Sequence, residues 1–405
     1  MTGQRLLSDI EGKIKHILMA STDINDVRRV KSTIDSFDED VEVTIAYQGN
    51  QDGIPNRRLA RAKRFLRADS HLEHLVADID GGRKVNFLPV ENYVWPWIQD
   101  CLHVLEGKRV FASYPLNDLP YSQRQKAQRT SLELIASPFW KEHGFAVSIN
   151  GEREYHTEGG DFITMGETVF VGNHQIFNYL AYKMGISPIS GLSDQAYTKS
   201  KKILLDALKL LDSERTVYSV EAPGQILQQH ADMVFTPVDE SHVVVADIHQ
   251  TLAYLDLPNK VKVVPFYENL ADQLEIIAEI LAKNFDVHRI PCIPRLYVPR
   301  KANRQNKAEI SEYADSLDIV PTFLSFNNVL QEEFSENGNK RHRIYMPVYP
   351  SYAFTGINPS KLTKIQSNAH NTYASLGCEV RDVLFNTFPA RDGVLHCTTL
   401  VLERG

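Results

Sequence analysis

Five side chains from four distant segments could together attack the carbon of a guanidinium group. The segments read Trp97-Ile-Gln-Asp100, Thr157-Glu-Gly-Gly-Asp161, His230-Ala-Asp-Met233 and Gly393-Val-Leu-His-Cys397. Together they offer a thiol, an imidazole and three carboxylates: Cys397, His230, Asp100, Glu158 and Asp232.

Each of these groups meets one requirement of that chemistry. The guanidinium carbon is resonance-stabilised and poorly electrophilic, so a thiolate is a suitable nucleophile. Carboxylates can grip the planar cation through its forked N–H donors. A free thiol has a pKa of about 8.5, so it needs a neighbouring imidazolium, or the cationic substrate, to ionise. A histidine would then protonate the departing nitrogen and activate water, with a third group to orient it.

Each residue alone also has a simpler structural interpretation. Cys397 is typical of a buried structural thiol, and His230 of a hydrogen-bonded polar histidine. Asp100 and Asp232 could be cap or turn residues. The Gly159-Gly160 pair could serve only to supply positive φ angles. The functional hypothesis therefore depends on the four segments occurring together.

A metal site is an alternative for part of this set. His230, Asp232, Asp247 and His249 could form the His/Asp site of a metallohydrolase. A position for Asp247 and His249 at an exposed strand end is the simpler account, so we expect no metal and no other cofactor. The sequence contains no phosphate-binding loop, GxGxxG or nucleotide-binding lysine motif.

The order of the motifs resembles the guanidino-group-modifying superfamily. The series W-x-x-D, E-G-G, H-x-D-M and G-x-x-H-C is closest in spacing to agmatine deiminase and the bacterial peptidylarginine deiminase. The resemblance runs from about Trp97 to the end of the chain. It implies the α/β pentein fold, a five-bladed pseudo-symmetric α/β propeller with the site in its central channel. It also implies that residues 1–405 form a single catalytic domain.

The resemblance implies a role for each matching residue. Cys397 would be the nucleophile and His230 the general acid and base. Glu158 would bind a guanidinium nitrogen and hold His230. Asp100 and Asp232 would clamp the guanidinium.

Two further residues are implied as substrate contacts, and three positions depart from the family pattern. Asn328, in Ser325-Phe-Asn-Asn328, resembles a family segment near the substrate, and Trp97 is a second candidate, although a core position explains it as well. Gln99 replaces the arginine usual in agmatine deiminases. Asp161 is more typical of arginine deiminase and dimethylarginine hydrolase, and residues 391–393 replace a glycine run.

The resulting expectation is a cysteine-dependent hydrolase, a deiminase, that acts through a covalent thiouronium-type intermediate. Agmatine, free arginine, a methylated arginine and a peptidyl arginine all remain open as substrates. An amidinotransferase that passes the amidine to an amine is the first alternative. A non-catalytic ligand-binding protein is the second.

The elements that must position these residues alternate between strands and amphipathic helices. A unit of strand, strand, helix and strand recurs about five times. The predicted helices span residues 25–37, 57–68, 124–143, 194–211, 269–282 and 359–376. The principal predicted strands span residues 16–20, 41–47, 85–90, 109–114, 145–149, 162–165, 169–171, 217–220, 232–235, 242–247, 287–290, 324–330, 343–348, 380–384 and 394–402. Polar stretches at 300–307 and 335–341 are predicted loops.

Composition limits the class of protein. The 405 residues carry a net charge of −7 and are 43% hydrophobic, typical of a globular protein and not of a nucleic-acid-binding one. We expect no secretory signal in the polar first fifteen residues and no membrane span. The four cysteines form no CxxC pair, which indicates reduced thiols in a cytoplasm. The expected partner is a small guanidinium compound; assembly into a homo-oligomer is left open.

Overall fold

The structure is a computed structural model of the whole chain. It describes residues 4–21, 27–48, 84–90, 94–113, 122–148, 157–172, 194–220, 230–252, 260–297, 320–350, 358–385 and 394–405. The helix expected at 57–68, the loop at 300–307 and the motif residues 391–393 lie outside these ranges.

Five sheets share one strand pattern, in which an antiparallel pair is followed by a parallel partner. The first sheet runs in the order β18 (Thr399–Arg404), β1 (Ile14–Ser21), β2 (Glu42–Gln48), β3 (Val85–Val90). The others are β4 (Leu102–Leu105), β5 (Arg109–Ala112), β6 (Ala146–Ser148); β7 (Phe162–Met165), β8 (Thr168–Gly172), β9 (Thr216–Val220); β10 (Phe235–Pro237), β11 (His242–Asp247), β12 (Asp286–Pro291); and β15 (Leu330–Glu336), β16 (Asn339–Val348), β17 (Glu379–Leu384). A separate pair joins β13 (Ile293–Tyr297) to β14 (Val320–Leu324).

A helix precedes the parallel partner in each sheet, because parallel neighbours need a crossover connection. These helices are α1 (Val27–Ser36), α3 (Ser122–Ala136) with α4 (Phe139–Glu142), α6 (Asp194–Leu211), α8 (His249–Leu252) with α9 (Lys260–Leu281), and α11 (Pro359–Ser375). The recurring unit of strand, strand, helix and strand is therefore confirmed. In the first sheet the antiparallel strand, β18, comes from the far end of the sequence.

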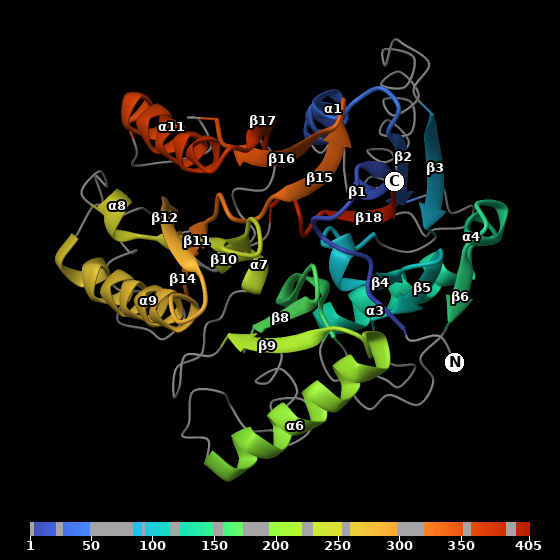
Figure 1. Cartoon of the computed structure of the whole chain (residues 1–405), viewed down its shortest axis with the longest axis horizontal. Helices are drawn as coiled ribbons and strands as arrows, with labels where there is room; N and C mark the ends of the chain where they lie inside the picture. Colours follow the sequence, from blue (N-terminus) through green and yellow to red (C-terminus); the bar gives the residue numbers. More distant parts are fainter. Residues whose placement is uncertain are drawn as a thin grey trace, which may run out of the picture.

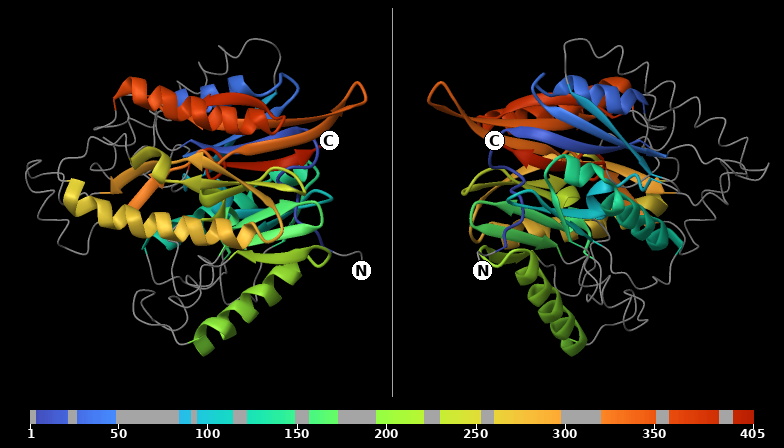
Figure 2. Two further views of the ribbon diagram at one scale, coloured as in Figure 1. Left: turned by 60° about the vertical axis from the view of Figure 1, so that its left-hand side comes forward. Right: turned by 90° about the vertical axis from the view of Figure 1, so that its right-hand side faces the viewer.

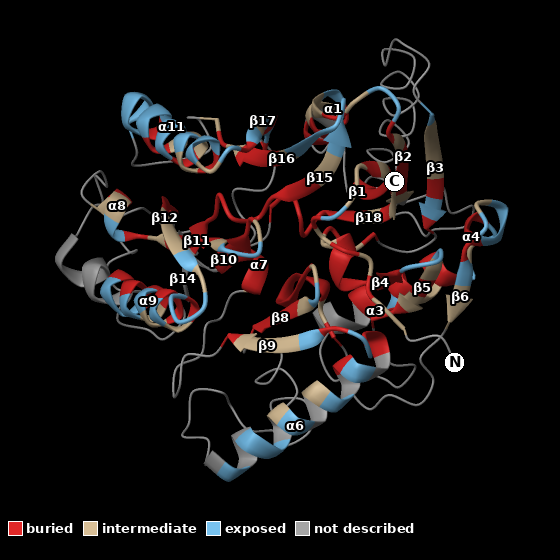
Figure 3. Ribbon diagram, viewed as in Figure 1, coloured by how far each residue is buried: buried red, intermediate tan, exposed pale blue. Residues whose placement is uncertain are grey.

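The sheets lie around a common centre, with α1, α6, α9 and α11 on the outside (Figure 1). Helix α6 extends away from the sheets in both side views (Figure 2). Buried residues gather at the centre and on the inner faces of the helices (Figure 3). In the part of the chain that the structure describes, no strand ladder joins one of these sheets to the next. The fold is thus mixed α/β, without a closed barrel.

Amphipathic helices cover the sheets. In α9, Leu270, Leu274, Ile277 and Leu281 recur at spacings of three and four and pack in one buried cluster with residues of β11. An apolar stripe of this period is what a helix needs to cover a sheet.

Residues 6–12 cross the ends of several sheets. The backbone N–H groups of Leu7, Asp9 and Gly12 donate to carbonyls in β4, β7 and β15 at 2.9, 3.2 and 2.8 Å respectively. The segment before β1 thus connects strands whose bonded residues, Val104 and Glu333, lie 229 positions apart in sequence.

Three predicted strands are wrong at positions that matter for the site. Residues 394–398 form a turn, and β18 begins only at Thr399. Residues 325–329 are irregular between β14 and β15. Residues 231–234 form the single-turn helix α7 (Ala231–Val234). In each case the apolar residues that suggested a strand are buried. A short apolar run indicates burial, but it does not distinguish a strand from a buried turn or helix.

Other boundaries also differ from the prediction, and α9 begins at Lys260 and not at Asn269. The helix expected at 124–143 is broken around Pro138, which caps α4, because proline cannot continue the hydrogen-bonding of α3. The loop expected at 335–341 is a hairpin between β15 and β16. Asn337 and Gly338 form its turn with φ angles of 52° and 79°, typical of a type I′ turn.

No helix among the described residues is long and apolar enough to cross a membrane.

Candidate active site

Cys397 lies in the turn before β18 and not in the strand itself. The Asn328 side-chain oxygen accepts hydrogen bonds from the backbone N–H groups of Val394 and Cys397 at 3.2 and 3.3 Å. The Thr398 hydroxyl donates to the Val394 carbonyl at 2.8 Å. A buried amide from the irregular segment before β15 therefore holds the turn that carries the thiol.

His230 faces that thiol from the start of α7. It is the N-cap residue of the helix, with extended backbone angles, so its ring points away from the helical turn. Its Nε2 lies 3.0 Å from Glu158 Oε2 and its Nδ1 lies 3.9 Å from Asp100 Oδ1. A ring nitrogen of His230 also lies within 4.8 Å of the Cys397 sulfur.

The two glycines of the second motif allow this close approach. A Cβ atom on Gly160 would lie 2.5 Å from His230 Nδ1, and one on Gly159 would lie 2.5 Å from the Gln99 carbonyl oxygen. Neither glycine has a positive φ, so the interpretation that they serve only to supply positive φ is wrong. They are required because the Gly159–Asp161 turn packs directly on the imidazole and on the first motif.

Asp161 anchors the helix that carries His230. Its Oδ1 accepts a hydrogen bond from the Ala231 backbone N–H at 3.1 Å, in the first turn of α7. The Asp161 side chain is fully buried. A carboxylate at this position satisfies an otherwise unpaired N–H of the helix start and fixes where His230 stands.

One carboxylate oxygen of Asp232 accepts three hydrogen bonds, and the other has no hydrogen-bond partner among the described residues. Its Oδ2 accepts from Asn328 Nδ2 at 2.7 Å, from His396 Nδ1 at 2.9 Å and from Cys397 Sγ at 3.3 Å. Its Oδ1, and Asp100 Oδ1, are buried without a hydrogen-bond partner among the described residues. Buried carboxylate oxygens are costly when left unpaired. These two atoms are therefore available acceptors for a ligand that carries N–H donors.

The three central groups have strongly shifted pKa values. Burial, supported by the charges of Glu158, Asp232 and Asp161, raises the pKa of Asp100 well above its usual range. Burial also raises the pKa of the Cys397 thiol to about 12, with a further contribution from Asp232. For His230, burial lowers the pKa, but the Asp100 charge and its other anionic neighbours outweigh this and leave it well above its ordinary value. At neutral pH the site therefore pairs an imidazolium with a protonated thiol.

Trp97 and the remaining cysteines lie around the centre and not within it. Trp97 is half-buried and packs against the apolar cluster that contains Cys397; its ring meets that of Trp95 at 4.8 Å. The thiols of Cys101 and Cys292 are buried, and burial raises the pKa of each well above its usual range.

The four-residue metal site is contradicted by the structure. His230 and Asp232 come within 4.8 Å of the Cys397 sulfur, whereas Asp247 and His249 join no such cluster within the described ranges. Asp247 instead accepts hydrogen bonds from the His249 backbone N–H at 2.9 Å and from the Gln250 side chain at 3.2 Å. It caps a short helix at the end of β11.

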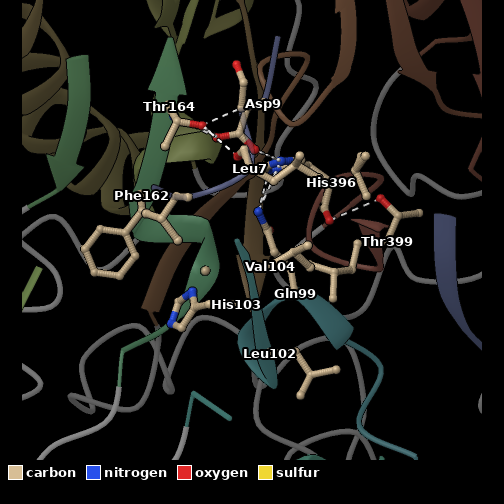
Figure 4. Close-up of a pocket in the computed structure, with 15 residues that line it drawn as sticks. Leu7, Asp9, Gln99, Leu102, His103, Val104, Phe162, Thr164, His396 and Thr399 are labelled. Carbon is tan, nitrogen blue, oxygen red and sulfur yellow. Dashed lines mark hydrogen bonds and ion pairs between the residues drawn. The ribbon is translucent and has the colours of Figure 1, made fainter. Parts of the chain in front are cut away.

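Three residues at the centre had no assigned role in the sequence interpretation. His396 lies between Asp232 and Asp9, and the Gln99 amide nitrogen lies 3.0 and 3.1 Å from its two ring nitrogens. A cavity of about 60 Å³ lies against them, and Figure 4 shows His396 facing Asp9 there. The His-Cys pair could have pointed to His396. No sequence signal pointed to Asp9, which lies 387 positions earlier.

The comparisons with known proteins identify the fold. No protein-family model and no curated protein matches the sequence. Among solved structures, a C. jejuni agmatine deiminase with substrate bound is 13% identical, with 99% of this chain and 97% of that chain covered and a TM-score of 0.59. The agmatine deiminase of Enterococcus faecalis is 13% identical, with 98% and 95% covered and a TM-score of 0.51.

A third structure, provisionally named a peptidyl-arginine deiminase, is 14% identical over the full length of both chains, with a TM-score of 0.55. The chain thus has the mixed α/β fold of agmatine deiminases, which confirms the resemblance that the motifs indicated. At these identities the likeness describes the fold and not the reaction.

Proposed function

We propose that the chain is a cysteine-dependent hydrolase of a guanidinium compound, a deiminase with Cys397 as the nucleophile. One observation carries this proposal: a thiol, an imidazole hydrogen-bonded to a glutamate, and two aspartates with free buried oxygens converge from four remote segments. That convergence matches the needs of guanidinium chemistry. None of the simpler interpretations of the single residues accounts for it.

Binding comes first. Asp100 Oδ1 and Asp232 Oδ1 accept N–H donors of the planar cation, and Glu158 offers a further carboxylate beside His230. Asn328 holds Asp232 from the side opposite to the free oxygen, and Trp97 contributes apolar surface near the thiol. A positive charge placed here offsets the burial that keeps the Cys397 thiol protonated. Substrate binding therefore promotes loss of the thiol proton to solvent, which leaves the Cys397 thiolate.

The next steps are attack by the Cys397 thiolate and departure of ammonia. The Cys397 thiolate forms a C–S bond to the guanidinium carbon, giving a tetrahedral adduct. The imidazolium of His230 gives its proton to the departing nitrogen, the C–N bond breaks, and ammonia leaves. The product of this half-reaction is a covalent thiouronium attached to Cys397.

Water completes the reaction. Neutral His230, held by Glu158 at 3.0 Å, takes a proton from a water molecule that attacks the same carbon. The C–S bond breaks, the hydroxyl proton of the adduct passes to the departing sulfur and restores the Cys397 thiol, and a ureido product is released. The group acts first as acid and then as base, and Glu158 keeps its ring in place for both steps.

The finer structural expectations belong to the same proposal. The five sheets would be the blades of a pentein propeller, and residues 1–405 would form one catalytic domain. The reaction needs no cofactor, and a cytoplasmic location would keep the thiol reduced.

A colorimetric assay for ureido products across a panel of guanidines tests the proposal. The panel contains agmatine, arginine, methylated arginines and an arginine peptide, with ammonia measured in parallel. We expect ureido product and ammonia in equal amounts from at least one of them. No product from any guanidine would refute the proposal, and turnover only with an added amine acceptor would indicate an amidinotransferase instead.

A further inference from the structure

A second histidine lies behind the proposed substrate clamp. His396 is buried beside Cys397. Its Nδ1 lies 2.9 Å from Asp232 Oδ2, and its Nε2 lies 3.4 Å from Asp9 Oδ1. It therefore bridges two carboxylates that lie 223 positions apart in the sequence, and Figure 4 shows its contact with Asp9.

The partners of His396 fix its charge. Burial lowers the pKa of His396, but hydrogen bonds to Asp232 and Asp9 outweigh it and raise that pKa to about 9. The ring is then an imidazolium, and both of its N–H groups donate to carboxylates. It can accept nothing from the Gln99 amide nitrogen. If the Gln99 amide is turned by 180°, its oxygen, which has no hydrogen-bond partner, faces the ring in place of the nitrogen. The imidazolium then has a third hydrogen-bond acceptor beside the two carboxylates.

Asp9 is itself held in place. Its Oδ2 accepts from the backbone N–H and the hydroxyl of Thr164 at 2.7 and 2.9 Å, which leaves Oδ1 for His396. The hydrogen bond and charge of His396, together with Thr164, outweigh burial and lower the pKa of Asp9. Asp9 therefore binds His396 as an ionised carboxylate, and it belongs to the segment that crosses the ends of β4, β7 and β15.

The bridge acts on the orientation of Asp232. With Asn328, His396 and Cys397 all directed at Oδ2, rotation of the carboxylate would break three hydrogen bonds at once. Oδ1 is thereby kept as the free acceptor. The imidazolium also offsets the negative charge of Asp232, which otherwise disfavours a thiolate at Cys397.

We propose that His396, held by Asp9, is a positioning residue that fixes Asp232 for guanidinium binding and favours ionisation of the Cys397 thiol. The inference rests on the proposed function for its kinetic part only, because thiol ionisation can be measured without substrate.

Two substitutions of His396 distinguish its contact with Asp232 from its contact with Asp9. His396→Asn keeps a side-chain donor near the position of Nδ1, toward Asp232, and loses the charge. His396→Gln keeps a donor near Nε2, toward Asp9, and loses both the charge and the contact with Asp232. His16→Asn is the matched control, because His16 is also buried and its ring contacts Thr44 at 2.8 Å and Glu42 at 3.9 Å in the first sheet, neither of which is a residue of the proposed site.

The first measurement is the rate at which iodoacetamide alkylates Cys397, followed by peptide mass spectrometry across a pH series. We expect about a tenfold lower rate at pH 8 in both His396 variants, equivalent to a thiol pKa higher by about one unit. A purely structural role would loosen the site and increase the rate, so the sign of the change separates the two accounts. An unchanged or faster rate overturns the electrostatic part of the proposal.

The second measurement is steady-state kinetics on the best guanidine substrate. We expect KM to rise about tenfold or more in His396→Gln and less in His396→Asn, because only the asparagine still orients Asp232. Equal KM values in both variants and the wild type overturn the positioning role. A wild type without turnover refutes the proposed function, and alkylation then still decides the inference.

Asp9→Asn keeps the test decisive if the His396 variants do not fold. It removes one charge with little change in shape and retains an acceptor for Thr164. We expect a smaller change of the same sign, about threefold in the alkylation rate. Wild-type alkylation and KM in this variant would refute the role of Asp9.

Discussion

Replacement of Gly160 by alanine tests whether the position of His230 controls the reaction. The added Cβ would lie 2.5 Å from His230 Nδ1 and 3.1 Å from its Cβ and Cγ, whereas ordinary contact begins at 3.4 Å. The ring must therefore move by about 1 Å out of the position in which Glu158 holds it. A displacement of that size in a catalytic group costs about 10²-fold in rate, or about 2.7 kcal/mol of transition-state stabilisation.

The substitution should leave the backbone unstrained, because Gly160 does not have a positive φ. Steady-state kcat on the best guanidine, measured together with the thermal unfolding midpoint, separates catalysis from stability. Gly107→Ala is the control: Gly107 has a φ of 74° with open space around it, so alanine there is strained by about 1 kcal/mol but touches nothing.

We expect Gly107→Ala to lower the unfolding midpoint while kcat is unchanged, and Gly160→Ala to lower kcat about a hundredfold. A Gly160→Ala variant with wild-type kcat and a wild-type midpoint would refute the reasoning, since His230 could then move freely without affecting the chemistry.

Three further predictions follow from the same structure. Cys397→Ser should lower kcat by about 10³-fold or more while the guanidine still binds, measured by calorimetry; residual turnover near the wild-type level would exclude a thiol nucleophile. The value of kcat/KM should rise with pH from 6 to 8, because the Cys397 thiol has a pKa of about 12 while the raised pKa of His230 keeps it protonated; a flat profile over this range would contradict these assignments. Arg343→Ala should destabilise the fold by about 3–5 kcal/mol in chemical denaturation, because it leaves Glu332, fully buried and 2.9 Å from Arg343 Nη1, without its charge partner; a loss below about 1 kcal/mol would show that other groups compensate.

The sequence was informative where its patterns are local. The segments 194–211 and 85–90 were predicted as a helix and a strand, and α6 and β3 have those bounds. Short motifs also indicated which side chains would meet, because the types and order of Asp100, Glu158, His230 and Cys397 match the demands of one reaction.

Prediction from the sequence failed where contacts between distant residues determine the local conformation or the position of a side chain. The turn at 394–398 resembles a strand in sequence, and it is a turn because Asn328, about 70 residues earlier, binds its backbone N–H groups. Asp9 carries no motif at all, and only the folded chain brings it to His396. The need for glycine at position 160 likewise becomes visible only once the imidazole is in place.

The pairing of β18 with β1 has a consequence for how the protein matures in the cell. The register joins Ile14 to Arg404 and Met19 to Thr399, so β1 must wait until residues nearly 400 positions later have been synthesised before its sheet is complete. Such distant pairing is slow to form, because the entropy of closing the loop must be overcome before any contact compensates for it. Nascent chains stalled before residue 399 would leave the edge of β1 that pairs with β18 exposed, so the first sheet can close only after residues 399–404 have been synthesised.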